Sequence, residues 1–206
     1  MLRAAGRRNV LPAVAAAVGL LFPAVSGRAE EKPRPAPTYL GLSLAVRHVS
    51  DEVFEEVYGP SGTILGLTAS QGFFGAQNFE LSAVIDIRRM RRDGLSTVSG
   101  VETRFGLTPL SLGLEGALVR GVAVLWLGLG GDLAFYREES GLGTTSGSTL
   151  GFHIAGGLAL HPWKTVPVRF KLFLRWTKAG TTENGIPAEL GGPEYGLGVL
   201  YGFRLL

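Results

Sequence analysis

Apolar residues recur at every second position from Thr38 to the end of the chain, which is the period of a β-strand with two unlike faces. No helical stripe of apolar residues follows Pro37, so we expect no helix there. Eight strands are predicted, six with strong alternation and two with weaker alternation. The strong segments are 38–47, 78–88, 124–136, 149–161, 167–176 and 195–205, and the weak ones are 64–70 and 101–114.

The connections between these strands alternate between long and short. The long polar ones are 51–62, 89–99, 138–148 and 178–193, and the tight ones are 73–77, 116–121 and 161–167. This order is typical of an antiparallel up-and-down barrel, with long loops at one end and short turns at the other. Within 101–114 the alternation changes phase at Thr108-Pro109, and because proline cannot donate to a sheet ladder, we expect a β-bulge there.

The residues between the apolar positions decide which face is buried. They are mostly Gly, Ala and Ser with scattered charges, and Gly is 31 of 206 residues against a usual value of roughly 7%. A soluble barrel would present Thr, Lys and Glu to water, so the large apolar side chains are expected to face lipid instead. Strands cross a bilayer only as a closed barrel. The predicted fold is therefore an all-β, eight-stranded antiparallel up-and-down transmembrane β-barrel.

The first 29 residues have the order of a secretory signal peptide. Three arginines lie among the first nine residues, Val10–Val25 is almost wholly apolar, and the small residues Gly27 and Ala29 follow. The apolar run of about sixteen residues is short of the roughly twenty that a membrane helix needs. We interpret 30–37 as a Pro-rich periplasmic lead-in and 38–206 as the barrel, which predicts export to the outer membrane of a Gram-negative cell envelope.

Net charge and cysteine usage exclude several function classes. The formal charge is +3, but four arginines precede Glu30 with no acid among them, leaving 16 basic and 17 acidic residues beyond position 29. A basic surface for nucleic acid is therefore not indicated. The chain has no Cys, which excludes disulfides, thiolate metal sites and a Cys nucleophile.

Charged residues at inward positions form the candidate site. They carry both signs, and unpaired charges in a confined interior are costly, so we expect a salt-bridged plug and no open pore. Inward glycines should let Trp126, Tyr136 and Phe173 pack across the lumen, since an eight-stranded barrel is only wide enough for side chains to fill. The predicted network comprises Arg47, Glu80, Asp86, Arg88, Glu102, Arg104, Glu115, Asp132, Arg169, Lys171, Arg175 and Arg204.

Four local patterns point to one family. They are the phase shift in 108–112 (TPLSL), the segment 126–131 (WLGLGG), the segment 151–157 (GFHIAGG) and the aromatic alternation of the last strand. Over 38–206 the chain resembles the small eight-stranded outer-membrane β-barrel domain, whose members include the transmembrane domain of outer-membrane protein A. The resemblance implies that the barrel-assembly machinery recognises the last strand. Such strands usually end in an aromatic residue, whereas this one ends in Leu206 after Tyr201 and Phe203.

Candidate chemistry outside the lumen is sparse. His153 is expected to be a packed lumen residue, and the three histidines lie on separate segments, so no metal site is predicted. The acidic residues of 51–56 lack the order of a calcium loop and indicate a solvated loop. The segment 141–147 (GLGTTSG) lacks a phosphate-loop Lys and is predicted to be a flexible loop.

These observations favour a structural or interaction barrel, porin-like only in architecture, and not an enzyme. Its expected partners are outer-membrane lipid and the assembly machinery, with no cofactor, and we expect a monomer. Two alternatives fit the same sequence. One is an enzyme that modifies lipid A, and the other is a soluble lipocalin-like periplasmic carrier with Leu42, Leu44, Phe170 and Leu172 lining a cavity.

Overall fold

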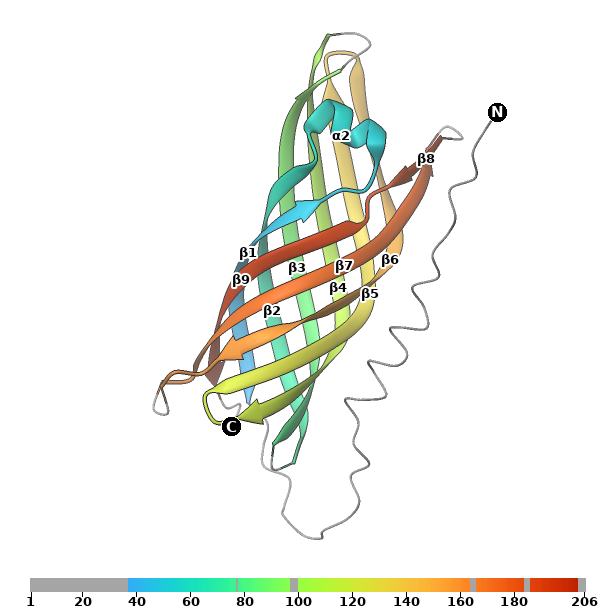
Figure 1. Ribbon diagram of the computed structural model, residues 1–206. Helices are drawn as coiled ribbons and strands as arrows, with labels where there is room; N and C mark the ends of the chain where they lie inside the picture. Colours follow the sequence, from blue (N-terminus) through green and yellow to red (C-terminus); the bar gives the residue numbers. More distant parts are fainter. Residues whose placement is uncertain (1–36, 77, 97–99, 164–165, 184–185, 204–206) are drawn as a thin grey trace, which may run out of the picture. The chain divides into compact units, whose positions relative to one another are not determined.

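The computed structural model describes residues 37–76, 78–96, 100–163, 166–183 and 186–203, and the proposed signal peptide lies outside this part. It contains strands and one short helix (Figure 1). The first five strands are β1 (Thr38–His48), β2 (Ser61–Ala76), β3 (Phe79–Leu95), β4 (Glu102–Arg120) and β5 (Ala123–Ser140). The others are β6 (Gly143–Leu160), β7 (Val168–Glu183), β8 (Ile186–Glu189) and β9 (Gly192–Phe203), and the helix is α2 (Glu52–Tyr58).

Eight of the strands form a closed antiparallel ring. The order is β6-β5-β4-β3-β2-β1-β9-β7, and β7 pairs with β6 to close it. The short strand β8 pairs only with the end of β7, through contacts such as Gly180 with Glu189. The predicted fold class is confirmed, and no helix in the described residues is long and apolar enough to cross a membrane.

The register sets the tilt of the strands. If the paired residues are followed once around the ring from Arg89, the path returns to β3 at Phe79, ten residues earlier. For eight strands with ordinary spacing this shear corresponds to a tilt of about 40° from the barrel axis. Such a barrel is narrow, and inward side chains from opposite strands meet across it.

The outer wall is apolar. Leu42, Leu65, Leu112, Leu172 and Leu197 are each more than half exposed, because they point away from the barrel axis. Exposed aromatic side chains lie toward both ends of this apolar band, as in the girdles of membrane barrels. They are Phe135, Phe152, Trp176 and Tyr195 toward the helix end, and Phe73, Phe74, Trp163, Phe170 and Tyr201 toward the other end.

This orientation excludes the carrier alternative. The residues expected to line a lipocalin-like cavity, Leu42, Leu44, Phe170 and Leu172, have exposed fractions of 68%, 52%, 41% and 52% on the outer wall. Lys171 and Phe173, which alternate with Leu172 on β7, line the interior instead.

The long connections are shorter than predicted because the strands continue beyond the apolar band. β3 extends to Leu95, and β5 and β6 run on to a tight turn at Gly141-Leu142. The segment 141–147 is therefore largely β-strand and not a flexible loop. In Figure 1 the β3–β4 and β5–β6 hairpins project beyond the other strands at the end of the barrel where α2 lies.

The predicted bulge at Thr108-Pro109 is absent. The pairing of β4 with β5 continues in one register through Thr108 and Pro109, and β3 pairs with β4 in the same register on both sides of this point. The phase shift has another cause, because Phe105 and Leu107 point inward while Leu110 points to the outer wall. The register shift that the structure does contain lies between Gly72 and Phe74 of β2.

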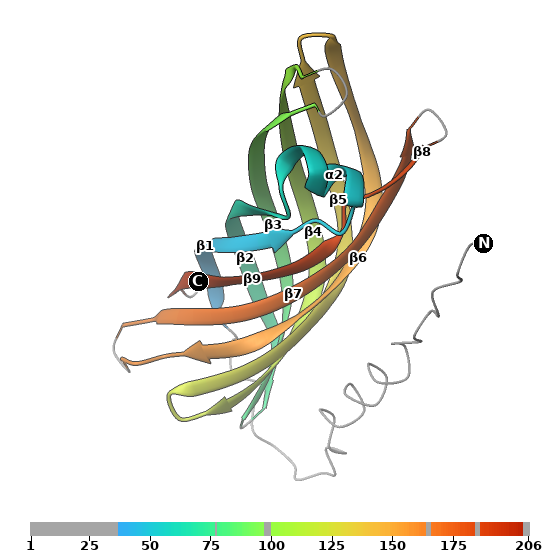
Figure 2. The same ribbon diagram turned by 45° about the horizontal axis from the view of Figure 1, so that its top comes forward.

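The first connection contains α2, which the alternation did not predict. Asp51 caps its N-terminus, accepting a hydrogen bond from the backbone N–H of Phe54 at 2.9 Å. Phe54 and Tyr58, one turn apart, are both buried. Figure 2 shows α2 at the end of the barrel from which the long hairpins project.

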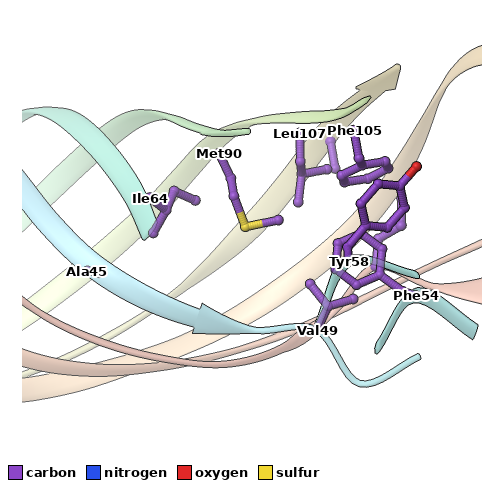
Figure 3. Close-up of a cluster of buried hydrophobic side chains, with 10 residues drawn as sticks. Ala45, Val49, Phe54, Tyr58, Ile64, Met90, Phe105 and Leu107 are labelled. Carbon is purple, nitrogen blue, oxygen red and sulfur yellow. The ribbon is translucent and has the colours of Figure 1, made fainter. Parts of the chain in front are cut away.

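An apolar cluster joins α2 to the barrel interior (Figure 3). Phe54 and Tyr58 contact Phe105 of β4, with ring centroids 4.9 and 5.6 Å apart. The other members are Ala45, Val49, Ile64, Met90, Leu107, Ala134 and Leu190. The cluster covers the charged interior of the barrel from the end where α2 lies.

Candidate functional site

The middle of the lumen holds a charged cluster to which every strand of the ring contributes. Small inward residues on neighbouring strands leave it room: a Cβ on Gly66 would lie 2.9 Å from the Arg88 side chain. Three arginines and three carboxylates balance its formal charge. The members of this central network are Arg47 (β1), Thr68 (β2), Asp86 and Arg88 (β3), Ser111 (β4), Asp132 (β5), His153 (β6), Arg175 (β7) and Glu194 (β9).

Glu194 binds two arginines in the upper part of the network. Its Oε1 accepts a hydrogen bond from Nη1 of Arg88 at 2.6 Å, and its Oε2 lies 3.9 Å from Nη1 of Arg47. Arg47 also donates to the backbone carbonyl of Leu190 at 2.8 Å. All three charged side chains are at most 2% exposed. Each therefore has an opposite charge as its partner in the interior.

Arg175 joins the two remaining carboxylates. It donates to Asp86 at 3.1 Å and to Asp132 at 2.5 Å, and also to Ser111 Oγ at 2.7 Å. Asp86 in turn pairs with Arg88 at 2.9 Å, which links this group to Glu194. The central network is thus continuous from β1 to β7 across the lumen.

Two further ion pairs lie between the central network and the short-turn end. Lys171 Nζ binds Glu115 at 2.7 and 2.9 Å and lies 3.7 Å from the ring centroid of Trp126. Arg169 binds Glu80 at 3.1 and 3.3 Å. Its guanidinium lies over the ring of Tyr39, 4.3 Å from the centroid, so each of these cations has both an anion and an aromatic partner.

A cavity of about 80 Å³ lies between these layers, lined by His153 and Arg175 of the central network and by Lys171, Glu115 and Trp126. This volume is enough for a few water molecules. Phe173 also lines the cavity and is packed against the apolar side chains on both sides of it.

Most of the charges expected in the lumen lie there, but two do not. Glu102 and Arg104 are exposed in the first residues of β4, where Arg104 binds exposed Asp93 at 2.9 Å. Their alternation places them on the outward face, which beyond the apolar band meets water. Arg204 lies outside the described residues.

Glu194 is the central residue that the sequence analysis missed. It directly precedes the predicted segment 195–205, in phase with the inward glycines Gly196 and Gly198. Extending that alternation by one residue would have identified it. Thr68 and Ser111 were also missed. A small hydroxyl residue at an inward position fits equally well as a hydrogen-bonding partner of the charged residues and as a small residue that leaves them room, and the sequence does not separate these two roles.

His153, Asp132 and Ser111 have the composition of a catalytic triad but not its geometry. His153 Nδ1 and Ser111 Oγ both contact Oδ1 of Asp132, at 3.0 and 2.5 Å, and Arg175 contacts the same oxygen. In a nucleophilic triad the histidine lies between the serine and the carboxylate. Here the carboxylate occupies that position, and the described residues contain no group of His, Asp or Glu that could hold a metal ion.

Comparisons with known proteins identify the fold. No family model and no curated protein matches the sequence. The structure is similar to the crystal structure of Neisserial surface protein A, with 14% identity over 81% of this chain and 97% of that one and a TM-score of 0.57. It is also similar to OprG from Pseudomonas aeruginosa (14% identity, 85% and 100% coverage, TM-score 0.58) and to Ail of Yersinia pestis in complex with the heparin analogue sucrose octasulfate (14%, 82% and 99%, 0.52).

The chain therefore has the fold of the small eight-stranded outer-membrane β-barrels. This confirms the resemblance that its sequence patterns indicated. At these identities the similarity concerns the fold.

Proposed function

We propose that the protein is an exported outer-membrane β-barrel with a closed lumen, whose roles are structural or depend on contacts at its projecting hairpins. The apolar outer wall with its two aromatic girdles supports membrane insertion. The proposal includes cleavage of the first 29 residues as a signal peptide, insertion through the assembly machinery and a monomeric state.

The single observation that carries the closed lumen is the central network. Its six charged side chains bind one another across the full width of the interior, and Arg47, Arg88 and Glu194 are almost completely buried. The cap formed by α2 and the apolar cluster adds a second obstruction at one end. An ion crossing the barrel would have to displace buried charges from their partners, which is costly.

Two measurements test this proposal. Fractionation of cells should recover the protein in the outer membrane with heat-modifiable gel mobility and a mature N-terminus near residue 30. Recovery in the soluble periplasmic fraction would contradict insertion.

The second measurement is conductance in planar lipid bilayers. We expect no sustained conductance from the inserted wild-type barrel and measurable conductance from a Phe173→Gly/Arg175→Gly variant, in which two lumen-filling side chains are removed. A matched variant of the exposed pair, Arg104→Gly/Asp93→Gly, should stay silent. Steady wild-type conductance would disprove the closed lumen.

A further inference from the structure

The cavity in the lumen has more positive than negative charge in its wall. Its charged lining side chains are three cations and two carboxylates: Arg88, Lys171, Arg175, Asp86 and Glu115. Glu194 and Asp132 also pair with the two arginines of this set, but neither of these carboxylates lines the cavity. The wall of the cavity therefore has an excess of one positive charge.

Three of the lining side chains each have a buried N–H group with no hydrogen-bond acceptor among the described residues. These groups are Nη2 of Arg88 on β3, Nε1 of Trp126 on β5 and Nε of Arg175 on β7. The three residues are 2%, 7% and 6% exposed. In the same part of the structure, no buried acceptor of the lining lacks a donor. Because buried donors in folded proteins are almost always satisfied, this lining favours the binding of an acceptor.

The size of the cavity limits what can provide that acceptor. Its volume is about 80 Å³, and Gly41, Gly113, Gly128 and Gly198 line it without side chains. Since a water molecule takes up about 30 Å³ in the liquid, this space holds a small ion with one or two water molecules. It is too small for an organic phosphate.

The ion pairs toward the short-turn end give access to the cavity. The side chains of Lys171 and Glu115 are 15% and 16% exposed, and those of Arg169 and Glu80 are 13% and 27% exposed. The almost completely buried part of the central network and the apolar cluster beneath α2 lie between the cavity and the helix end. A small solute therefore reaches the cavity from the short-turn end.

We propose that this cavity binds a small monovalent anion of the halide class. One such ion balances the excess charge of the wall and accepts charge-assisted hydrogen bonds from N–H groups of three strands. A water molecule accepts hydrogen bonds but leaves the charge uncompensated. The carboxylates of the wall are already bound to its cations, Glu115 to Lys171 at 2.7 Å and Asp86 to Arg175 at 3.1 Å.

Bromide tests the site directly, because its anomalous scattering locates this halide in crystals. Crystals of the mature barrel, residues 30–206, are soaked in sodium bromide. We expect an anomalous peak in the cavity, within hydrogen-bond reach of Trp126 Nε1 and of a guanidinium nitrogen of Arg88 or Arg175. Peaks at the protein surface only, which mean an adventitious ion only, or water alone in the cavity would overturn the site.

Urea unfolding in phospholipid vesicles measures the affinity for bromide, with sodium gluconate keeping the ionic strength constant. A ligand of the folded state raises stability as its concentration rises. The variant is Trp126→Phe, which removes the indole N–H but keeps an aromatic ring beside Lys171. Its matched control, Trp176→Phe, removes the same group from the outer wall.

We expect Trp126→Phe to bind bromide at least about tenfold more weakly, because it loses one hydrogen bond to a charged acceptor. The Trp176→Phe control should bind bromide as the wild type does. Equal bromide dependence in the variant and the control would contradict the proposal.

Gly198→Ala is a second variant, which reduces the cavity without removing a charge or a donor. Its Cβ would lie 3.4 Å from the carbonyl oxygen of Leu42 and 3.7 Å from the Lys171 side chain, so the methyl group fits. Bromide binding should weaken in this variant too. Unchanged binding would mean that the anion lies elsewhere.

This inference concerns the interior of the barrel and does not rest on the proposed membrane function. Heat-modifiable gel mobility shows for each sample that the barrel is folded. Folded barrels without a bromide site disprove the anion site alone. Folded barrels that bind bromide but are recovered in the soluble periplasmic fraction disprove the membrane function and support the anion site.

Discussion

Lys171, Leu172 and Phe173 show how successive residues of one strand meet different surroundings. Lys171 binds Glu115 inside the barrel, Leu172 is 52% exposed on the outer wall, and Phe173 packs in the lumen against both apolar clusters. Of the three, only Leu172 is more than half exposed. The effect of a substitution on β7 should therefore alternate along the strand.

Replacing Leu172 with Arg should lower the free energy of unfolding by about 2–4 kcal/mol, because it places a charge in the hydrocarbon region. Phe173→Gln, on the inward side, should cost less, since its amide can reach the polar groups that line the cavity. Urea unfolding in phospholipid vesicles measures both. A larger loss for Phe173→Gln would reverse the assignment of the two faces.

The orientation of these residues could be predicted from sequence, but their pairing could not. Alternation decides whether a side chain points inward, as it did for Asp86, Arg88 and Arg175. Which charges then meet depends on the stagger of the whole ring, which brings Glu194 of the last strand to Arg88 of the third. No spacing along the chain encodes that contact.

Helix α2 is an element that the alternation of apolar and polar residues did not predict. It has seven residues, and its buried side chains Phe54 and Tyr58 are separated by two glutamates and one valine, so no apolar stripe marks it. A helix this short is not stable alone and depends on tertiary contacts. Tyr58 supplies two of them, because its hydroxyl donates to Glu138 at 2.5 Å and its carbonyl accepts from Arg92 at 3.1 Å.

The docking of α2 should depend on alkaline pH. Burial of the Tyr58 phenol, together with its hydrogen bond to Glu138, raises the pKa of Tyr58 above its ordinary value. The unfolded state then ionises first as pH rises, so this contribution to stability is complete below about pH 10 and is lost above it. Urea unfolding of wild type and Tyr58→Phe across this range measures the effect.

Tyr58→Phe should be less stable than wild type at neutral pH, because Glu138 loses its donor. The difference should shrink as pH rises above about 10, since only the wild type loses stability from this group. A difference that is constant with pH would show that Tyr58 ionises equally in both states.

β4 is a second element that the alternation did not fully predict. The alternation of apolar residues in β4 changes phase at Pro109. A β-bulge produces this pattern, and so does a strand whose apolar side chains point inward before the proline and outward after it. The structure has the second arrangement, which places Phe105 and Leu107 in the cluster beneath α2.

Helix α2 and the phase shift of β4 thus belong to one feature, the apolar cluster in which Phe54 and Tyr58 pack against Phe105. The sequence pattern of either segment alone does not reveal that cluster.

For the molecule as a whole, ring closure and the central network depend on each other. The stagger of ten residues tilts the strands and brings inward residues of β1, β3 and β9 together at one level. The charges bound there come from strands far apart in the sequence, and Glu194 is the described carboxylate that pairs with both Arg47 and Arg88. Loss of this carboxylate should weaken the whole barrel.

We expect Glu194→Gln to lower the free energy of unfolding by about 3–5 kcal/mol, because it leaves buried arginines with too little compensating charge. The exposed pair is the matched comparison: Arg104→Gln should change stability by no more than about 1 kcal/mol. Both values come from urea unfolding in vesicles. Equal effects of the two substitutions would mean that water compensates the interior charges.

The position of Glu194 on β9, the strand between β1 and β7 in the ring, has a consequence for assembly of the barrel. Until β9 is present, Arg47 and Arg88 have no carboxylate from that strand, and an incomplete sheet would carry this excess positive charge into hydrocarbon. A chain truncated before β9 therefore lacks a hydrogen-bonding neighbour for β1 and a counterion for two guanidinium groups at once. Charge balance in the interior and closure of the ring therefore depend on the same strand.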